Sequence, residues 1–101
     1  MDVEFEIAGR LVVWDENKAE INKLKHRVSF ETAARIFLDE NFCEYHLDED
    51  SYEIIGKSEE IIVALFTERQ KISQLISARR ANKLEEAQYY GQYSDLPGNE
   101  N

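Results

Sequence analysis

Hydrophobic residues repeat with two different periods along this chain, and the period changes near residue 42. Just before this point, over 30–37, apolar residues are spaced as on one face of an α-helix, at Phe30, Ala33, Ala34 and Phe37. After it, apolar and polar residues alternate over 43–47, which is typical of a half-buried strand. Helices and strands therefore occupy separate segments, which indicates the α+β class.

The N-terminal segment predicts a strand or a hairpin. Its first apolar residues alternate with Glu4 and Glu6, and Gly9 supplies a turn before a second apolar stretch at 11–14. The alternating apolar residues are Val3, Phe5 and Ile7.

Two helices are predicted next. Asp15 can cap a helix that runs to about Lys25, because its carboxylate can accept hydrogen bonds from the free N–H groups of the first turn. We expect Ile21 and Leu24 to form the buried side of this helix. Ser29 can cap the second helix, which carries the helical apolar face described above.

The rest of the chain predicts strands and a final helix. A continuous apolar run at 61–67 suits a central strand covered on both faces. Gly56 is expected to introduce a short loop at 57–60, which would make the flanking strands antiparallel neighbours. The remaining elements are strands at 52–55 and 71–78 and a helix at 81–90 that buries Ala81, Leu84 and Ala87.

These elements predict an α+β fold with an N-terminal strand or hairpin, two helices, an antiparallel sheet of three to four strands and a C-terminal helix. A length of 101 residues and a hydrophobic content of 43% suit one domain with one core. We assign residues 1–93 to that domain. The segment 94–101 is rich in polar residues, Pro and Gly, and is predicted to be a disordered tail.

The charge of the chain is unevenly distributed. The formal net charge is −9. Residues 39–60 hold nine acidic residues against Lys57 alone, a net charge of −8. Residues 69–83 hold five basic residues and no acid, and residues 18–35 hold five basic residues against two acids. Two basic patches therefore survive in an acidic chain, and clustered Lys and Arg are what phosphate binding requires.

Several classes of protein are excluded or disfavoured. Four glycines cannot form a dinucleotide-binding loop or a P-loop, and the chain has no CxxC pair. His26 and His46 lack the spacing of a metal site, so we expect no metal and no cofactor. Cys43 stands alone and is expected to be a buried small hydrophobic residue. The sequence has no apolar run long enough to cross a membrane, which favours a cytoplasmic location.

Four separated motifs resemble the BrnT family of bacterial toxins. The resemblance covers residues 12–90, and the motifs occur in the family's order and spacing. They are Trp14-Asp15-Glu16-Asn17-Lys18, Lys25-His26-Arg27-Val28-Ser29-Phe30-Glu31, Thr67-Glu68-Arg69 and Ile76-Ser77-Ala78-Arg79-Arg80-Ala81-Asn82.

The resemblance implies a small ribonuclease of RelE-like fold that cleaves RNA and arrests growth. It also implies a cognate antitoxin with a ribbon-helix-helix DNA-binding part, so that contact with DNA would be indirect, through the antitoxin. The sequence leaves a homo-oligomer open.

Basic side chains can perform the steps that RNA cleavage without a metal requires. The 2′-OH must lose a proton, the phosphate must be stabilised as it becomes dianionic, and the leaving oxygen must gain a proton. The candidate catalytic residues are Lys25, His26, Arg69 and Arg79, which we expect to meet in one basic cleft. The candidate RNA-binding residues are Arg27, Lys71, Arg80, Lys83 and Tyr89.

Each candidate also has a purely structural interpretation. His26 can interact with the dipole of its helix, as an alternative to proton transfer. Arg79 can form an ordinary ion pair with Glu68. Tyr89 can pack against the core instead of stacking on a base.

Three positions differ from the pattern that the resemblance implies, because Arg27 stands where relatives usually carry Gly, and Ser51 and Gln74 stand where they commonly carry Arg. Two fewer cations near a dianionic phosphate would slow cleavage. An alternative hypothesis is therefore a catalytically weakened relative that acts as an antitoxin-binding or regulatory module. A third hypothesis is an acidic interaction protein that uses residues 39–60 to bind a basic partner.

Overall fold

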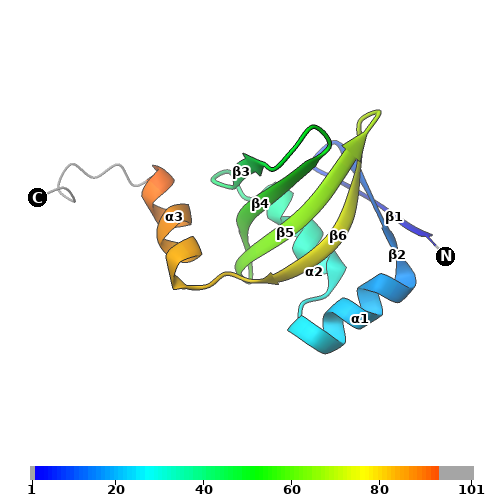
Figure 1. The fold of residues 1–101 in the computed structure, drawn as a ribbon, viewed down its shortest axis with the longest axis horizontal. Helices are drawn as coiled ribbons and strands as arrows, with labels where there is room; N and C mark the ends of the chain where they lie inside the picture. The colour runs from blue at the N-terminus through cyan, green and yellow to red at the C-terminus, as the bar shows by residue number, and fades with distance from the viewer. Residues whose placement is uncertain (1, 94–101) are drawn as a thin grey trace, which may run out of the picture.

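One six-stranded sheet organises the chain (Figure 1), for which the computed structural model describes residues 2–93. The strand order is β1-β2-β6-β5-β4-β3. All neighbouring strands are antiparallel except β2 and β6, which are parallel. The strands are β1 (Asp2–Ile7), β2 (Arg10–Asp15), β3 (Cys43–His46), β4 (Ser51–Ser58), β5 (Glu60–Arg69) and β6 (Ile72–Arg80).

The first two helices begin where the sequence predicts caps. The Asp15 carboxylate accepts a hydrogen bond from the N–H of Lys18, and the Ser29 hydroxyl accepts one from the N–H of Thr32. The helical elements are α1 (Glu16–His26), α2 (Phe30–Ala34), the 3₁₀ helix η1 (Arg35–Leu38) and α3 (Lys83–Tyr93).

The predicted antiparallel sheet of three to four strands is wrong. The N-terminal hairpin joins the main sheet, because residues 11–13 of β2 pair in parallel with residues 72–74 of β6. The short strand β3 extends the opposite edge by pairing with β4. The result is a six-stranded mixed sheet with three α-helices, still of the α+β class.

The two faces of the sheet are covered by different helices. Trp14 and Phe30 contact edge to face, with ring centroids 5.9 Å apart, in the core between the sheet and α2. On the opposite face, Tyr89 of α3 packs with Val63 in a smaller cluster that also contains the buried Cys43. The prediction of a buried Cys43 is therefore confirmed. The helical spacing of Phe30, Ala33, Ala34 and Phe37 is confirmed as well, since all four are buried.

Gly56 lies inside β4, so the prediction that it introduces a loop at 57–60 is wrong. A Cβ atom at this position would lie 2.9 Å from the Cβ of Ile36 and 3.1 Å from that of Phe42. The glycine therefore allows η1 to approach the sheet closely. The turn between β4 and β5 is made instead by Glu59, whose φ is 67°.

The predicted buried faces of α1 and α3 are wrong. Ile21 and Leu24 are 59% and 84% exposed, and Leu84 is 71% exposed. Ala87 is exposed too, and among residues 83–91 of α3 the buried one is Tyr89. Helical spacing identifies which residues share a face, but it does not show which face meets the sheet when the apolar content of a helix is low.

Asn22 fixes α1 against the edge of β6. The pairing of β2 with β6 ends at Val13 and Gln74, so within residues 2–93 no strand pairs with this edge of β6 beyond Gln74. There the Asn22 amide donates to the carbonyl of Ala78 at 2.8 Å and accepts from its N–H at 3.1 Å. It also donates to the carbonyl of Val28. The side chain thus takes the place of a neighbouring strand.

No helix within residues 2–93 is long and apolar enough to cross a membrane. The predicted tail at 94–101 lies outside the residues that the structure describes, so it remains a prediction.

We expect Asn22→Ala to lower the free energy of unfolding by about 2–4 kcal/mol, because buried backbone groups of Ala78 and Val28 lose their partners. Urea unfolding would measure the change. Asn17→Ala on the exposed side of the same helix is the control and should cost less than about 1 kcal/mol. Equal effects of the two substitutions would contradict this role of Asn22.

Candidate functional site

The C-terminal end of α1 and the middle of β6 form a small cavity. The contact between Asn22 and Ala78 places Lys25 and His26 of α1 beside Ser77 of β6. The cavity measures about 180 Å³ and is lined by Lys18, Ile21, Asn22, Lys25, His26, Ile76 and Ser77. An anion in this cavity would meet basic side chains at its wall.

Arg79 lies two residues beyond Ser77 on β6. Ala78 between them is buried in the core, so Ser77 and Arg79 share the other face of the strand. Arg79 therefore extends the basic surface away from the cavity, toward α3.

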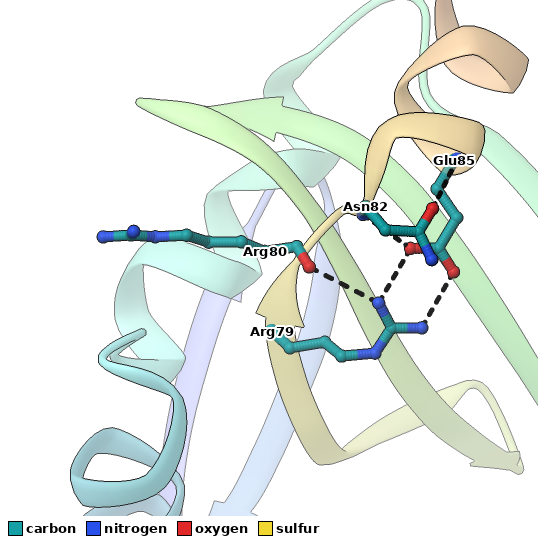
Figure 2. A network of polar contacts seen from close by, with 4 residues as sticks. All are labelled: Arg79, Arg80, Asn82 and Glu85. Carbon is teal, nitrogen blue, oxygen red and sulfur yellow. Dashed lines mark hydrogen bonds and ion pairs between the residues drawn. The ribbon is translucent and has the colours of Figure 1, made fainter.

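The Arg79 guanidinium is held by Glu85 of α3, and not by Glu68 (Figure 2). Its Nη1 and Nη2 donate to the two carboxylate oxygens at 2.7 and 2.8 Å. Glu85 also accepts from the N–H of Asn82 at 2.9 Å, and the Asn82 side chain accepts from the N–H of Glu85 at 2.8 Å. This reciprocal cap begins α3 and orients the carboxylate toward Arg79.

The geometry keeps both partners of the ion pair charged at neutral pH. Hydrogen bonds from Arg79 lower the pKa of Glu85 below its usual value, although burial opposes the shift. The same hydrogen bonds raise the pKa of Arg79. The Arg79 side chain is 40% exposed, so a phosphate from solvent can still reach the guanidinium.

Tyr89 anchors α3 at a second point. Its hydroxyl donates to the Asp39 carboxylate at 2.6 Å, and the N–H of Lys57 donates to the same carboxylate at 2.8 Å. Burial raises the pKa of Asp39, but these hydrogen bonds and one from the N–H of Asn41 outweigh it, so the pKa is lowered. Because Tyr89 is only 2% exposed, its ring packs against the core in this conformation.

Arg69 lies far from Arg79. Arg69 pairs with Ile72 at the turn between β5 and β6, whereas Arg79 pairs with Val63 at the other end of the same strands. At about 3.3 Å per residue, the two ends are about 23 Å apart. The expected meeting of Arg69 and Arg79 in one cleft therefore does not occur.

A separate hollow of about 420 Å³ surrounds Arg69. Ser51, Thr67 and Gln74 form one row across β4, β5 and β6, and all three line it. Ser51 and Gln74, at which the resemblance led us to expect Arg, therefore lie on either side of Thr67 and line the same hollow. The wall is completed by two acidic residues, Asp48 and Asp50.

The remaining RNA-binding candidates are scattered over the surface. Arg27 ends α1 in a left-handed conformation, with a φ of 61°, and lines a hollow on another side of that helix. Lys71 lies in the turn after β5, and Lys83 is exposed at the start of α3. Arg80 pairs with Glu60 at 3.1 Å.

Three residues of this site were not among the predicted site residues: Asn22, Ser77 and Glu85. The pattern Asn82-x-x-Glu85 at the start of the last helix is a capping signal that could have identified Glu85. Asn22 lies on the same face of α1 as Ala19 and His26, and these three residues are less exposed than the other residues of the helix. No local signal places Ser77 beside α1.

Comparison with known proteins agrees with the resemblance seen in the sequence. A family model described as the ribonuclease toxin BrnT of type II toxin-antitoxin systems matches residues 14–85. A solved structure of the Brucella abortus ribonuclease toxin BrnT is 27% identical, with a TM-score of 0.60, and the match covers 69% of this chain and 94% of that one. The comparison with curated proteins gives no match.

Glu85 should make folding pH-dependent. Its pKa is lower in the folded chain than the value of about 4.3 expected after unfolding, so its contribution to stability is present above that pH and is lost as the pH falls through the folded-state pKa. We expect Glu85→Gln to unfold at lower urea concentration than the wild type at neutral pH. The difference should shrink in acid. Glu86→Gln is the control, and a difference that is constant with pH would contradict the expectation.

Proposed function

The chain belongs to the BrnT family of ribonuclease toxins of type II toxin-antitoxin systems, and from this premise we propose that it cleaves RNA without a metal. Membership of such a system implies an antitoxin partner. We further propose that this partner is a ribbon-helix-helix protein that neutralises the cleavage, and that the chain acts in the cytoplasm.

The observation that carries the proposal is the cavity in which Lys25 and His26 of α1 adjoin Ser77 of β6. These side chains come from two motifs that are more than fifty positions apart in the sequence. A phosphodiester bound there would meet a group able to accept a proton and a fixed positive charge.

The proposed reaction uses these groups in sequence. His26 takes the proton from the 2′-OH, the 2′-oxygen attacks the phosphorus, and the 5′-oxygen leaves with a proton. Lys25 lines the cavity beside His26 and supplies that proton. The products would be a 2′,3′-cyclic phosphate and a free 5′-OH.

Arg79 is proposed to stabilise the phosphate as it becomes dianionic. The Glu85 carboxylate accepts two parallel hydrogen bonds from the Arg79 guanidinium, and a phosphate can accept the same pair. RNA would therefore replace a carboxylate at a guanidinium that is already oriented.

The outlying basic residues are proposed to bind the RNA backbone away from the scissile bond. Arg69 and Lys71 would contact the strand at one end of the sheet, and Arg27, Arg80 and Lys83 would contact it nearer to the cavity. Contact between Tyr89 and a base would require α3 to move, because the ring is buried.

A second function is favoured by the row of Ser51, Thr67 and Gln74. This row places two neutral side chains beside Arg69, next to Asp48 and Asp50. Such a surface attracts phosphate weakly. The alternative is therefore a chain with little cleavage activity that acts by binding its antitoxin.

RNA cleavage by the purified chain distinguishes the two functions. We expect cleavage in the presence of EDTA, and Arg79→Ala should reduce the rate by about 10²–10³-fold, because a charge that stabilises the transition state is lost. Lys25→Ala and His26→Ala should also reduce it. Gel analysis of the cleaved RNA would measure these rates.

Arg35→Ala is the matched control, because Arg35 is exposed on η1, away from the cavity. Addition of the antitoxin should suppress the activity. Absence of cleavage at high protein concentration would instead support the binding module.

Glu85→Gln should strengthen RNA binding, because it frees the Arg79 guanidinium from a competing carboxylate. We expect an increase in affinity of about tenfold, measured by fluorescence anisotropy with a single-stranded RNA. Glu86→Gln removes the same charge from the next residue and should have a smaller effect. Equal changes in the two variants would mean that only net charge matters.

A further inference from the structure

The outer edge of β1 has no partner strand among residues 2–93. β1 is the first strand of the sheet order and pairs only with β2. It lies at one side of the molecule beside the N-terminus (Figure 1). The family model begins at residue 14, so β1 is outside the part of the chain that the family shares.

The register of the hairpin determines which backbone groups of β1 face outward. Ile7 and Arg10 flank a two-residue turn in which Ala8 and Gly9 both have positive φ. Residues that flank such a turn exchange hydrogen bonds with each other, and hydrogen-bonded pairs then alternate along the strands. The inward-bonded residues of β1 are therefore 3, 5 and 7. The free N–H and C=O groups belong to Asp2, Glu4 and Glu6.

The side chains of β1 divide in the same way. Asp2, Glu4 and Glu6 are exposed on one face, and the alternate residues Val3, Phe5 and Ile7 are half-buried against the core on the other. The strand contains no Pro and no bulge, so its backbone can accept another strand, and its three carboxylates oppose an acidic neighbour and not a basic one. A strand added here would continue both the hydrogen bonding and the apolar layer.

We propose that the edge of β1 docks an extended segment of a partner protein with Lys or Arg at alternate positions and apolar residues between them. In such pairing, side chains directly opposite each other lie on the same face, so the basic residues would face Asp2, Glu4 and Glu6. A second copy of β1 would place acids opposite acids, which is unfavourable. The charge pattern therefore selects a basic partner.

The test uses a fluorescently labelled hexapeptide of alternating Lys and Val, added to the intact chain. We expect saturable, salt-sensitive binding in fluorescence anisotropy, and slower amide hydrogen exchange at Asp2, Glu4 and Glu6. A peptide of alternating Glu and Val should not bind. Because no RNA is involved, the result is independent of the proposed ribonuclease activity.

Variants separate charge from backbone pairing. Glu4→Lys with Glu6→Lys should weaken binding by at least about tenfold. The matched control is Glu40→Lys with Glu49→Lys, which changes net charge equally at exposed positions outside β1. Glu4→Pro removes an N–H that faces outward, so it should weaken binding more than Glu4→Gln does while the hairpin remains folded.

Three results would overturn the proposal: no binding at millimolar peptide, equal loss of binding in the control pair, or no difference between Glu4→Pro and Glu4→Gln. Self-association that is abolished by Glu4→Lys with Glu6→Lys would overturn it as well, because the occupant of the edge would then be a second copy.

Discussion

The hydrogen bonds between Asn22 and Ala78 hold together two parts of the molecule that share little apolar surface. α1 buries one residue, Asn22, and exposes its larger apolar side chains. Its position is therefore set by directional bonds to the unpaired edge of β6. Apolar contacts tolerate sliding, but an amide paired with both backbone groups of one residue fixes register along the strand. This register decides that Lys25 and His26 face Ser77.

The site exists because the sheet is incomplete. β2 pairs with only three residues of β6 and then becomes α1 at Asp15, so the edge near Ala78 is left for a side chain. A β2 that stayed paired with β6 beyond Val13 would have covered this edge and removed the cavity beside it. The separation of β2 from β6 also sets the direction of α1, because the helix begins where β2 ends. Because Asp15 caps the start of α1, it helps to determine where the basic residues at the end of the helix lie.

Local patterns predicted the elements well and their arrangement poorly. The caps at Asp15 and Ser29 and the helical face that begins at Phe30 depend on neighbours within a few residues, and they were confirmed. The parallel pairing of β2 with β6 joins residues about sixty positions apart, and no local pattern reports it. The separation of Arg69 from Arg79 follows from strand register, which the charge pattern does not contain. The BrnT family, in contrast, was predicted from four motifs and is shown by the family model.

The cap of α3 explains how Arg79 can be both ordered and available. One carboxylate oxygen of Glu85 accepts hydrogen bonds from both Arg79 and the N–H of Asn82. The Asn82 side chain accepts a hydrogen bond from the N–H of Glu85. If Arg79 turned to another anion, both bonds of the cap would remain. The helix therefore does not depend on the ion pair, and Tyr89 holds its other end through Asp39. An arginine whose partner is fixed by other contacts can exchange that partner for a phosphate without unfolding the element that orients it.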